Sequence, residues 1–410
     1  MRFFYGWYLI GIVWVLYGFA ASPGYYSWSF FAPEVMEELE LTRAQAGNVF
    51  GLLMFMLSAM SPVSGMAVAR WGSRRILVVG NLIMVLGFWG LSSADSLLEC
   101  YLYYGLLVGG GMGLGTFITC QTLATDWFTK YRARAVAIVL TAGGVVGKLV
   151  YQFDAVMVQD YSWRTGWFIL AMLTLLLAVL AWVGVRNHPS EMGQYPDGIA
   201  PDSRCALQPL ESEDQTAKTW TPNAAIRTSQ FAVLCLSAVA CFVPWTVCVG
   251  HGRLHLEDLG FSTDVAAGVL GSMVLVSIVG RLCGGLGDFL VPEKVLGYAL
   301  LIEGVGVLGF LFAKTAVMAY LFTVLIALGF GAGYISLAVV LARFFGPAVF
   351  AQTLGINYLI SGIFQAVSPG LAGWTFDVMG SYRLAFSTVT LLTVVGAIFT
   401  LRIRPPQPPA

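Results

Sequence analysis

Two cations lie inside long apolar stretches of this chain. Arg281 is surrounded by Val, Leu, Ile and Gly, and Lys148 lies in a stretch of similar character. A guanidinium is always ionised, and its planar fork of N–H donors matches one carboxylate in a bidentate manner. In an apolar setting it needs an anion, a carbonyl or water. Arg281 is therefore the first candidate to bind an anionic substrate, and a salt bridge between helices is the alternative.

Lys148 is open to two interpretations. It supplies a second charge for a dianion, or it faces Asp154, Glu303 or a backbone carbonyl. Asp154, Glu303 and His251 are the candidates for a titratable group that takes up a proton. His251 is of a type that titrates near physiological pH. For each of the three, a structural pair or hydrogen bond is the alternative.

The chain lacks the residue patterns of enzymes, phosphate-binding loops, metal sites and nucleic-acid-binding proteins. The chain has no H-E-x-x-H, no paired aspartates on one helix and no G-x-S-x-G, so no enzyme is predicted. The run 109–115 is rich in glycine but has no following Lys-Ser/Thr, which excludes a phosphate loop. The seven cysteines form no C-x-x-C pair, and neither a metal nor a cofactor is expected. The 22 basic and 22 acidic residues cancel, which gives no support for a nucleic-acid partner.

The composition places these residues in a bilayer. Of the 410 residues, 58% are hydrophobic and 11% are charged, and the mean hydropathy is +0.78; soluble domains carry about 25% charged residues. The apolar runs do not alternate with polar residues, which excludes a β-barrel. At about 20 residues per helix, we predict an all-α integral membrane protein with twelve transmembrane helices. The expected spans are 5–31, 44–69, 75–94, 97–127, 132–157, 164–186, 228–256, 264–289, 294–313, 315–344, 348–375 and 382–402.

The chain divides into two halves. Residues 187–227 are polar and rich in Pro, Asp and Ser, which predicts a flexible cytoplasmic linker between a six-helix bundle at 1–186 and another at 228–410. Glycines of the first half recur at a nearly fixed offset in the second: Gly111, Gly113, Gly115 and Gly144 correspond to Gly329, Gly331, Gly333 and Gly362. Two pseudo-symmetric bundles predict a rocking transporter whose substrate site lies near the midplane between them.

Most of the 22 Lys and Arg residues lie on one side of the predicted membrane, together with both termini and the linker. The positive-inside rule therefore places both termini in the cytoplasm. The chain begins with Arg2 and an apolar stretch that has no small-residue cleavage site, which predicts a retained first span. The expected location is the cell inner (plasma) membrane.

Several motifs indicate a family. The segment Gly65-x-x-x-Ala69-Arg70-Trp71-Gly72-Ser73-Arg74-Arg75 is similar to the loop motif of the major facilitator superfamily, with Ala69 in place of its acid. Further motifs resemble the branch that holds the monocarboxylate transporters and oxalate:formate antiporters. They are Tyr25-Tyr26-Ser27-Trp28-Ser29-Phe30, Trp127-Phe128-Thr129-Lys130-Tyr131-Arg132, His251 with Asp258-Leu259-Gly260, Gly280-Arg281, and Pro369-Gly370-Leu371-Ala372-Gly373.

The resemblance implies roles for particular residues. It assigns Arg281 to the substrate carboxylate and places Tyr26, Phe117, Phe330, Tyr334 and Asn357 at pocket positions of the oxalate carriers. The stretch around Asn357 has no lysine where those carriers have one, which favours a monoanion unless Lys148 substitutes for it. Ser277 stands where mammalian monocarboxylate carriers have an aspartate one turn before the arginine.

Charged residues at the cytoplasmic span ends are candidates for gating. Ion pairs between the halves would latch the outward-facing state there, and plain positive-inside anchoring is the alternative. The candidates are Arg70, Arg74, Asp126, Arg132, Asp288 and Arg343.

These observations predict a secondary transporter that moves a small monocarboxylate, such as lactate or pyruvate, by alternating access. Proton symport is the first expectation, and the transport unit is expected to be a monomer. An exchanger of dicarboxylates such as oxalate and formate, using Arg281 with Lys148, is the alternative. A drug exporter and a non-transporting sensor are less favoured, because an exporter pocket does not ordinarily need a central arginine.

Overall fold

The computed structural model describes residues 4–199, 220–284 and 290–407. Their secondary structure is helical throughout, with no strand in these ranges. Eleven of the described helices are long and apolar enough to cross a membrane. Helix α15, Pro347–Met379, is a further long helix and occupies the position of the predicted span 348–375. The predicted all-α membrane fold is therefore confirmed.

Helix boundaries in the N-terminal half agree closely with the predicted spans. The first span is a continuous helical stretch, and the fourth is built from consecutive short elements. The elements are α1 (Tyr5–Ser22), η1 (Pro23–Ser27), α2 (Trp28–Glu38), α3 (Arg43–Trp71), α4 (Ser73–Leu91), α5 (Leu97–Cys100), η2 (Tyr101–Val108), α6 (Gly109–Gly115), α7 (Phe117–Trp127), α8 (Arg132–Asp160) and α9 (Trp163–Gly184).

The linker contains the short helices η3 (Pro189–Met192), η4 (Pro196–Gly198) and α10 (Pro222–Ile226). The C-terminal half follows with one long helix per span. These are α11 (Ser229–Asp258), α12 (Thr263–Gly284), α13 (Pro292–Leu311), α14 (Ala316–Phe345), α15 (Pro347–Met379) and α16 (Arg383–Arg402).

Many of these helices begin at a Ser or Thr that caps the free backbone N–H groups. Thr42 starts α3 as a capping box, in which its side chain accepts from the Gln45 backbone and the Gln45 side chain accepts from the Thr42 backbone. Ser162, Thr228 and Thr315 cap α9, α11 and α14 in the simpler way. The breaks between spans are thus specified locally.

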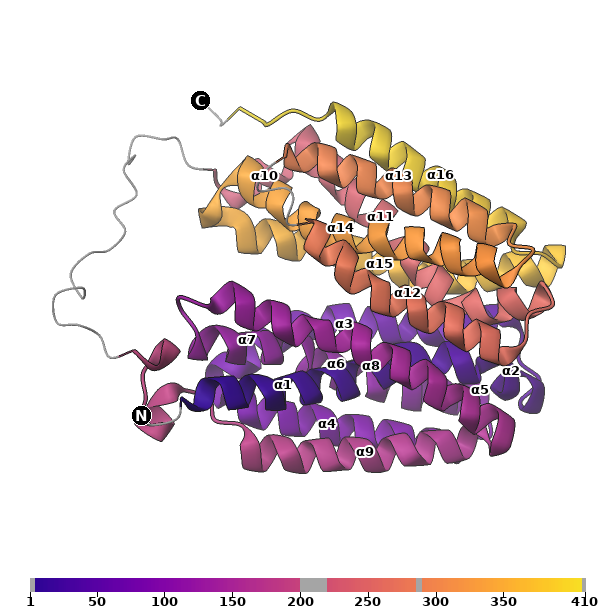
Figure 1. Ribbon diagram of the computed structural model, residues 1–410, viewed down its shortest axis with the longest axis horizontal. Helices are drawn as coiled ribbons and strands as arrows, with labels where there is room; N and C mark the ends of the chain where they lie inside the picture. Colours follow the sequence, from indigo (N-terminus) through magenta and orange to yellow (C-terminus); the bar gives the residue numbers. More distant parts are fainter. Residues whose placement is uncertain (1–3, 200–219, 285–289, 408–410) are drawn as a thin grey trace.

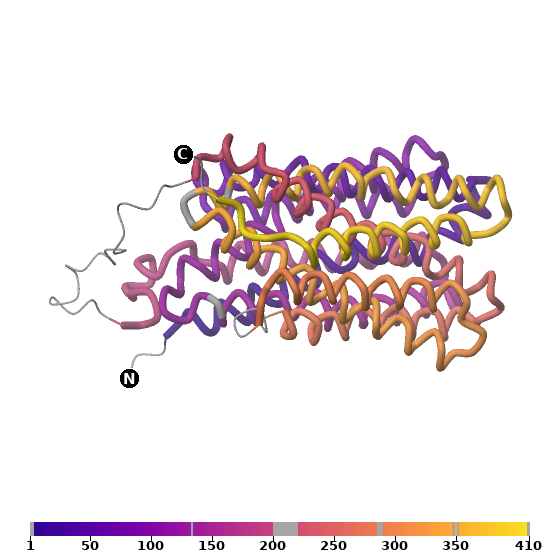
Figure 2. The backbone as a smooth tube through the Cα atoms, turned by 90° about the horizontal axis from the view of Figure 1, so that it is seen from above, coloured from indigo at the N-terminus to yellow at the C-terminus, as the bar shows by residue number. Residues whose placement is uncertain are grey.

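The two halves lie side by side with their helices roughly parallel. Figure 1 shows α1–α9 along one side and α11–α16 along the other. Helix α3 packs along α15, and α8 packs along α12, so these two pairs form the contact between the halves. Both described chain ends and the linker lie at one end of the bundle (Figures 1 and 2). We call this the linker end, and the opposite end, where α2 and α11 finish, the far end.

The first span is longer than predicted. Helical structure continues from Tyr5 to Glu38, beyond the expected end at residue 31. Within it, Pro23–Ser27 forms a π-helical turn. Such turns insert an extra residue and occur often at functional sites. Glu34 and Glu38 therefore lie on a helix rather than in a loop.

The described part of the linker is anchored rather than free. Asp197 accepts hydrogen bonds from the backbone N–H groups of Thr129 and Lys130 at 3.0 and 2.8 Å. Asn187 accepts from the backbone N–H of Arg74 at 2.9 Å, at the start of α4. Residues 187–199 therefore pack on the N-terminal half, and the prediction of a uniformly flexible linker is wrong for them. Residues 200–219 lie outside the described ranges.

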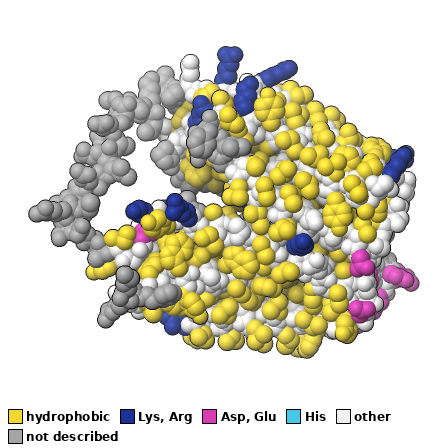
Figure 3. Space-filling view, viewed as in Figure 1, with side chains coloured by type: hydrophobic (Ala, Val, Ile, Leu, Met, Phe, Trp, Pro, Cys, Tyr) yellow, Lys and Arg dark blue, Asp and Glu magenta, His cyan; other side chains and the backbone are white. Residues whose placement is uncertain are grey.

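The outer surface suits a bilayer. Apolar side chains cover most of the face in Figure 3. Exposed large apolar residues occur on helices of both halves, among them Leu176, Trp182, Leu282 and Phe399. Because soluble proteins rarely expose apolar area on this scale, the surface is that of a multi-pass membrane protein.

Candidate functional site

Arg281 lies where the two halves meet. It belongs to the last described turn of α12, and its Nη1 donates to the Leu140 carbonyl oxygen of α8 at 3.1 Å. Its Nε is buried and has no hydrogen-bond partner among the described residues. The guanidinium also lies 5.6 Å from the ring centroid of Tyr334. One edge of the fork is therefore held by the protein, and another N–H donor is left over for an anion.

Glycines place Tyr334 beside Arg281. A Cβ atom on Gly331 of α14 would lie 2.6 Å from the Arg281 backbone nitrogen, and one on Gly280 of α12 would lie 2.7 Å from the Ala327 carbonyl oxygen. Only glycine permits backbones to approach this closely. These contacts bring α12 and α14 together and set the arginine next to the tyrosine.

Aromatic side chains of the C-terminal half surround Tyr334. Phe330 stacks on Trp245 with ring centroids 4.0 Å apart, and it lies 6.2 Å from Tyr334. Phe242 lies 5.8 Å from both Tyr334 and Tyr358. The predicted residues Phe330 and Tyr334 are thus together. Sequence reasoning missed Phe242, Trp245 and Tyr358, because single aromatics in apolar spans look like ordinary packing.

The N-terminal half supplies a facing set. Phe117, at the start of α7, packs edge-on against Tyr17 of α1 at 5.5 Å. Tyr26, in η1, lies 5.3 Å from Tyr151. Tyr17 and Tyr26 both lie close enough to Arg281 to interact with it electrostatically. The predicted Phe117 and Tyr26 therefore belong to the same region as Arg281, and Tyr17 is an addition that the sequence did not single out.

Asn357 lies within the C-terminal half. It is fully buried on α15, and its Nδ2 donates to the Cys235 sulfur of α11 at 3.6 Å. Its Oδ1 is buried with no hydrogen-bond partner among the described residues. Asn357 forms no hydrogen bond with Arg281 or Tyr334, both of which the structure describes, so its role in orienting a substrate stays a prediction.

Lys148 lies at the same interface but further toward the far end. Its backbone and Cγ pack against Gly271 of α12, where a Cβ atom would lie 3.3 Å from the Lys148 Cγ. Within the described ranges it forms no ion pair. Leu140, the partner of Arg281, is eight residues earlier on α8, which is roughly 12 Å along the helix axis. Arg281 therefore contacts α8 at a different level from the one at which Lys148 leaves that helix.

The proton candidates have different surroundings. Asp154 is fully buried on α8, and the Ser27 hydroxyl donates to its Oδ1 at 3.1 Å. Glu303 is fully buried on α13, and neither oxygen has a hydrogen-bond partner among the described residues. A charged carboxylate in either place is costly.

His251 is fully engaged. Its Nε2 lies 2.7 Å from the Pro369 carbonyl oxygen, and its Nδ1 lies 2.9 Å from the Tyr382 hydroxyl. A carbonyl only accepts, so a neutral ring donates from Nε2 to Pro369 and accepts at Nδ1 from Tyr382. Both contacts stay within the C-terminal half.

At the linker end, the predicted gating residues form no ion pair between the halves among the described residues. Arg343 pairs with Glu293 of its own half at 3.1 Å, and Asp126 lies 4.0 Å from the His188 ring nitrogen. The Arg74 guanidinium lies 4.4 Å from the ring centroid of Trp182. The others are Arg70 and Arg132, which are exposed, and Asp288, which lies outside the described residues. Their gating role stays a prediction.

Ion pairs that join the halves lie at the far end, where none was predicted. Arg43, the first residue of α3, donates to both carboxylate oxygens of Asp258, the last residue of α11, at 2.5 and 2.8 Å. Arg253 of α11 donates to Glu34 of α2 at 2.5 and 2.8 Å and also to the Phe30 carbonyl oxygen. We call these two pairs the far-end latch.

Further contacts join the halves near the latch. Asp377 of α15 accepts from the backbone N–H groups of Arg43 and Ala44 at 3.1 and 2.8 Å, so a residue of one half caps a helix of the other. Gln159 of α8 donates to Asp264 of α12 at 2.9 Å. The molecule is therefore closed at the far end.

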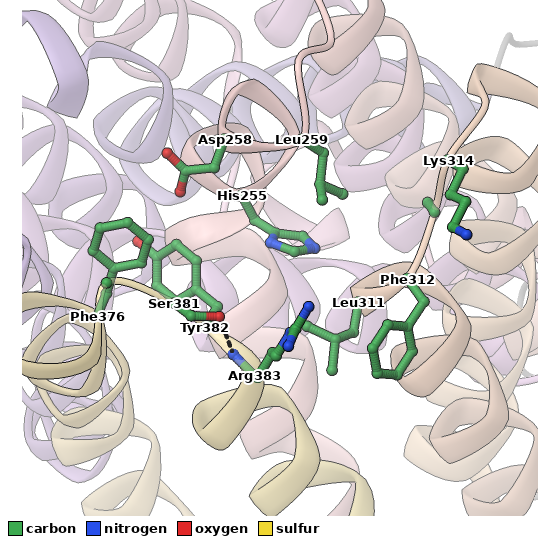
Figure 4. Close-up of a pocket in the computed structure, with 12 residues that line it drawn as sticks. His255, Asp258, Leu259, Leu311, Phe312, Lys314, Phe376, Ser381, Tyr382 and Arg383 are labelled. Carbon is green, nitrogen blue, oxygen red and sulfur yellow. Dashed lines mark hydrogen bonds between the residues drawn. The ribbon is translucent and has the colours of Figure 1, made fainter.

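A cavity of about 280 Å³ lies at the far end of the C-terminal half (Figure 4). Its lining includes His255, Asp258, Lys314, Tyr382 and Arg383. None of the predicted substrate residues lines it. We therefore assign the candidate substrate site to the surroundings of Arg281 and not to this cavity.

Two helical bundles that meet at a half-buried arginine beside aromatic side chains match the architecture of a membrane transporter. The profile of the Major Facilitator Superfamily matches residues 13–289. The chain belongs to this superfamily, as its motifs predicted, and its relatives are transporters and not enzymes.

The relatives refine the comparison. The chain is 24% identical to the uncharacterized MFS-type transporter YhjX of Escherichia coli (strain K12), over 82% of this chain and 81% of that protein. It is 22% identical to monocarboxylate transporter 2 of Homo sapiens, over 97% and 85%. A bacterial homologue of the human lysosomal transporter Spinster, in an inward-facing, occupied conformation, has the same fold with a TM-score of 0.75 and 16% identity, over 98% and 97%.

Proposed function

We propose that the chain transports small monocarboxylates, of the lactate and pyruvate type, across the membrane. The observation that carries this proposal is Arg281. It lies between the halves, is held on one side by the Leu140 carbonyl, and keeps a buried N–H donor that has no hydrogen-bond partner among the described residues. One carboxylate satisfies that donor and neutralises the charge. Similarity to relatives such as monocarboxylate transporter 2 supports the same substrate class.

The surrounding groups give the site its selectivity. The ring of Tyr334 lies 5.6 Å from the guanidinium, while Phe330, Phe117 and Tyr26 supply apolar walls that suit a short carbon chain. Asn357 has a free amide oxygen for a second polar contact if its helix approaches the site during the cycle. A substrate carboxylate would bind Arg281, and a 2-hydroxy or 2-oxo group would face Tyr334.

In the proposed mechanism, the substrate crosses the membrane because the far end and the linker end of the bundle close in turn. In the proposed orientation the linker end faces the cytoplasm, as the positive-inside rule predicts for a plasma-membrane protein with both termini inside. The far-end latch then closes the outer side and leaves the substrate site accessible from the cytoplasm. To expose the site to the outside, the latch would open, and charged residues of the cytoplasmic rim would form ion pairs between the halves. These rim residues are Arg70, Arg74, Asp126, Arg132, Asp288 and Arg343.

Proton symport is the proposed mode of coupling, with Asp154, Glu303 and His251 as candidate groups. Because a carboxylate carries negative charge, an accompanying proton makes the transported unit neutral. Anion exchange is the second candidate. A dicarboxylate exchanger would use Arg281 together with Lys148, whose backbone lies roughly 12 Å along α8 from Leu140, the residue that Arg281 contacts.

The test is uptake of radiolabelled lactate and pyruvate into proteoliposomes. We expect an inward proton gradient to drive accumulation in the native protein, and Arg281→Ala to abolish it. Arg281→Lys retains the charge but loses the fork, so partial activity with a raised KM is expected. Arg402→Ala, at an exposed arginine that ends α16, is the matched control and should behave as the native protein.

Other outcomes separate the alternatives. Uptake only against internal carboxylate would mean exchange. Uptake of oxalate but not of lactate or pyruvate would identify a dicarboxylate carrier. Full monocarboxylate transport by Arg281→Ala would contradict the assignment of the substrate site.

A further inference from the structure

Asp154 and its neighbours form a buried polar group in the N-terminal half that substrate binding does not use. The Asp154 side chain is fully buried, and its Oδ2 has no hydrogen-bond partner among the described residues. The Tyr151 hydroxyl, one turn earlier on the same helix face, is also buried and has none. The group therefore buries polar atoms that lack hydrogen bonds in an apolar setting, which costs free energy of folding. A function in transport would explain why this cost is tolerated.

Asp154 forms no ion pair with any cation of the described residues. The titratable and charged groups that face it are Tyr151 on α8, Tyr104 on η2 and Arg253 on α11. The Tyr104 hydroxyl already donates a hydrogen bond to the Gly24 carbonyl oxygen at 2.9 Å. Arg253 directs its N–H groups to carboxylates and a carbonyl elsewhere, namely Glu34, Glu257 and Phe30. A proton is the simplest ion that the free oxygen can hold.

The position of Asp154 links the substrate site to the latch. Its partner Ser27 is the last residue of the π-helical turn Pro23–Ser27. The preceding residue, Tyr26, belongs to the proposed substrate walls, and Phe30, one turn further, holds Arg253 of the latch. The segment from Tyr26 to Phe30 thus contacts the proposed substrate region, Asp154 and the far-end latch.

The two other candidates lack such a connection. Glu303 lies on α13, which packs on α14 and α16 at the side away from the N-terminal half (Figure 1). Both ring nitrogens of His251 have partners within the C-terminal half. Asp154 lies on α8, which packs directly against α12 across the interface.

We propose that Asp154 is the group that carries the coupled proton, and that the turn Pro23–Ser27 transmits its state to the far-end latch. This inference rests on the proposed proton symport and names its acid. An ionised Asp154 only accepts hydrogen bonds, as it does from the Ser27 hydroxyl, whereas a protonated Asp154 can also donate one. The hydrogen bonds of the turn therefore change when the proton binds. A turn with π-helical hydrogen bonds is the part of the first span best able to adjust.

The experiment compares two transport modes in proteoliposomes. Asp154→Asn should lose proton-driven accumulation of lactate but keep counterflow, in which labelled lactate exchanges for unlabelled lactate without net proton movement. Asp154→Glu should keep both, because it retains a titratable carboxyl. Asp160→Asn makes the same chemical change at an exposed site on the same helix and should leave both unchanged. Gradient-driven accumulation by Asp154→Asn at the native level, or its loss in Glu303→Gln alone, would overturn the inference.

A second measurement does not depend on transport. Infrared difference spectra of the purified native protein, recorded without substrate across a pH series, should contain the band of a buried carboxylic acid that titrates. Because Glu303 is a second buried carboxyl group, the spectra are compared in the Glu303→Gln background. There the band should be present with Asp154 and missing in Asp154→Asn, and its persistence in the double variant would overturn the inference. If the native protein shows neither uptake nor counterflow of any carboxylate, the proposed function fails, and the spectra still decide whether Asp154 takes up the proton. Monodisperse elution of each variant establishes that it is folded.

Discussion

The two ends of the molecule hold their charges in different ways. At the far end, Arg43 and Arg253 pair with acids of the opposite half. At the linker end, the pair Arg343–Glu293 stays within one half. Both ends are charged, so the number of charges does not distinguish them. The difference is whether a pair crosses the interface, and this shows which end the structure closes.

The ends also differ in how deeply the arginines are buried. The Arg253 side chain is 3% exposed, whereas that of Arg343 is 46% exposed. Exposed ion pairs contribute little to stability because water and salt screen them. Removing one partner of a buried pair leaves an uncompensated charge and costs far more. The far-end latch is therefore expected to control the equilibrium between the two closed states.

The largest effect is expected from Arg253→Ala. This change leaves Glu34 without its cation and the Phe30 carbonyl without its donor, at a cost of about 3 kcal/mol to the far-end-closed state. That cost corresponds to a shift of roughly a hundredfold in the equilibrium between the two states. Distances between spin labels at the far ends of α3 and α15, measured by pulsed electron resonance, should lengthen.

Arg343→Ala is the matched change at the other end. Its pair with Glu293 lies within the C-terminal half and does not cross the interface, so the far-end distances should stay as in the native protein. Equal shifts in the two variants would contradict the contrast drawn between the ends.

A smaller effect is expected from Asp377→Ala. The carboxylate caps two backbone N–H groups at the start of α3, and losing a helix cap costs about 1 kcal/mol. Because the cap comes from the other half, this cost falls only on the closed far end. The same spin-label distances should show a modest open population, and Asp377→Asn, which keeps one oxygen acceptor, should show less of it. An Asp377→Ala population larger than that of Arg253→Ala would reverse the proposed order.

The smallest effect concerns the linker anchor. Burial opposes ionisation of Asp197, but the Thr129 hydroxyl and the backbone N–H groups of Lys130, Thr129 and Tyr131 outweigh it and hold the pKa of Asp197 below its ordinary value. A lowered folded pKa means that the anchor is intact above the unfolded pKa and is lost as the pH falls through the folded one. The protection factors of the amide hydrogens of residues 129–131, which correct for the intrinsic effect of pH on exchange, should therefore fall only in acid, below about pH 4.

Asp197→Asn supplies the control for the anchor. It should show lower protection factors at residues 129–131 at neutral pH and little further change in acid. Protection factors that do not depend on pH in the native protein would mean that Asp197 does not hold this loop.

The fold was predictable because apolar length is a local property. Runs of about 20 apolar residues located the spans, and Thr42 shows how a cap marks a boundary in sequence. The first span was underestimated because Glu34 and Glu38 look like loop residues until their partners Arg253 and Arg164 are known. The linker was misjudged for a related reason, since Asn187 and Asp197 are typical both of flexible segments and of caps.

The candidate site was predictable in part. Arg281 could be recognised because a cation in an apolar span needs a partner, and Tyr334 followed from the resemblance. The far-end latch could not be inferred, because Glu34 and Arg253 are 219 residues apart and their pairing depends on how the halves dock. A usable signal was present, namely that Arg43 and Arg253 stood among the few cations on the side with little positive charge.

The contact between α3 and α15 also has an entropic side. A methyl group on Gly47 or Gly51 would collide with the carbonyl of Pro369 or Ala366, so backbone meets backbone there without intervening side chains. Immobilising a long side chain costs up to about 2 kcal/mol of conformational entropy, and glycine has no side chain to immobilise. In the proposed transport cycle, the contact between α3 and α15 can therefore form and separate without ordering side chains. The equilibrium between the closed and open far end then depends on the polar contacts at that end.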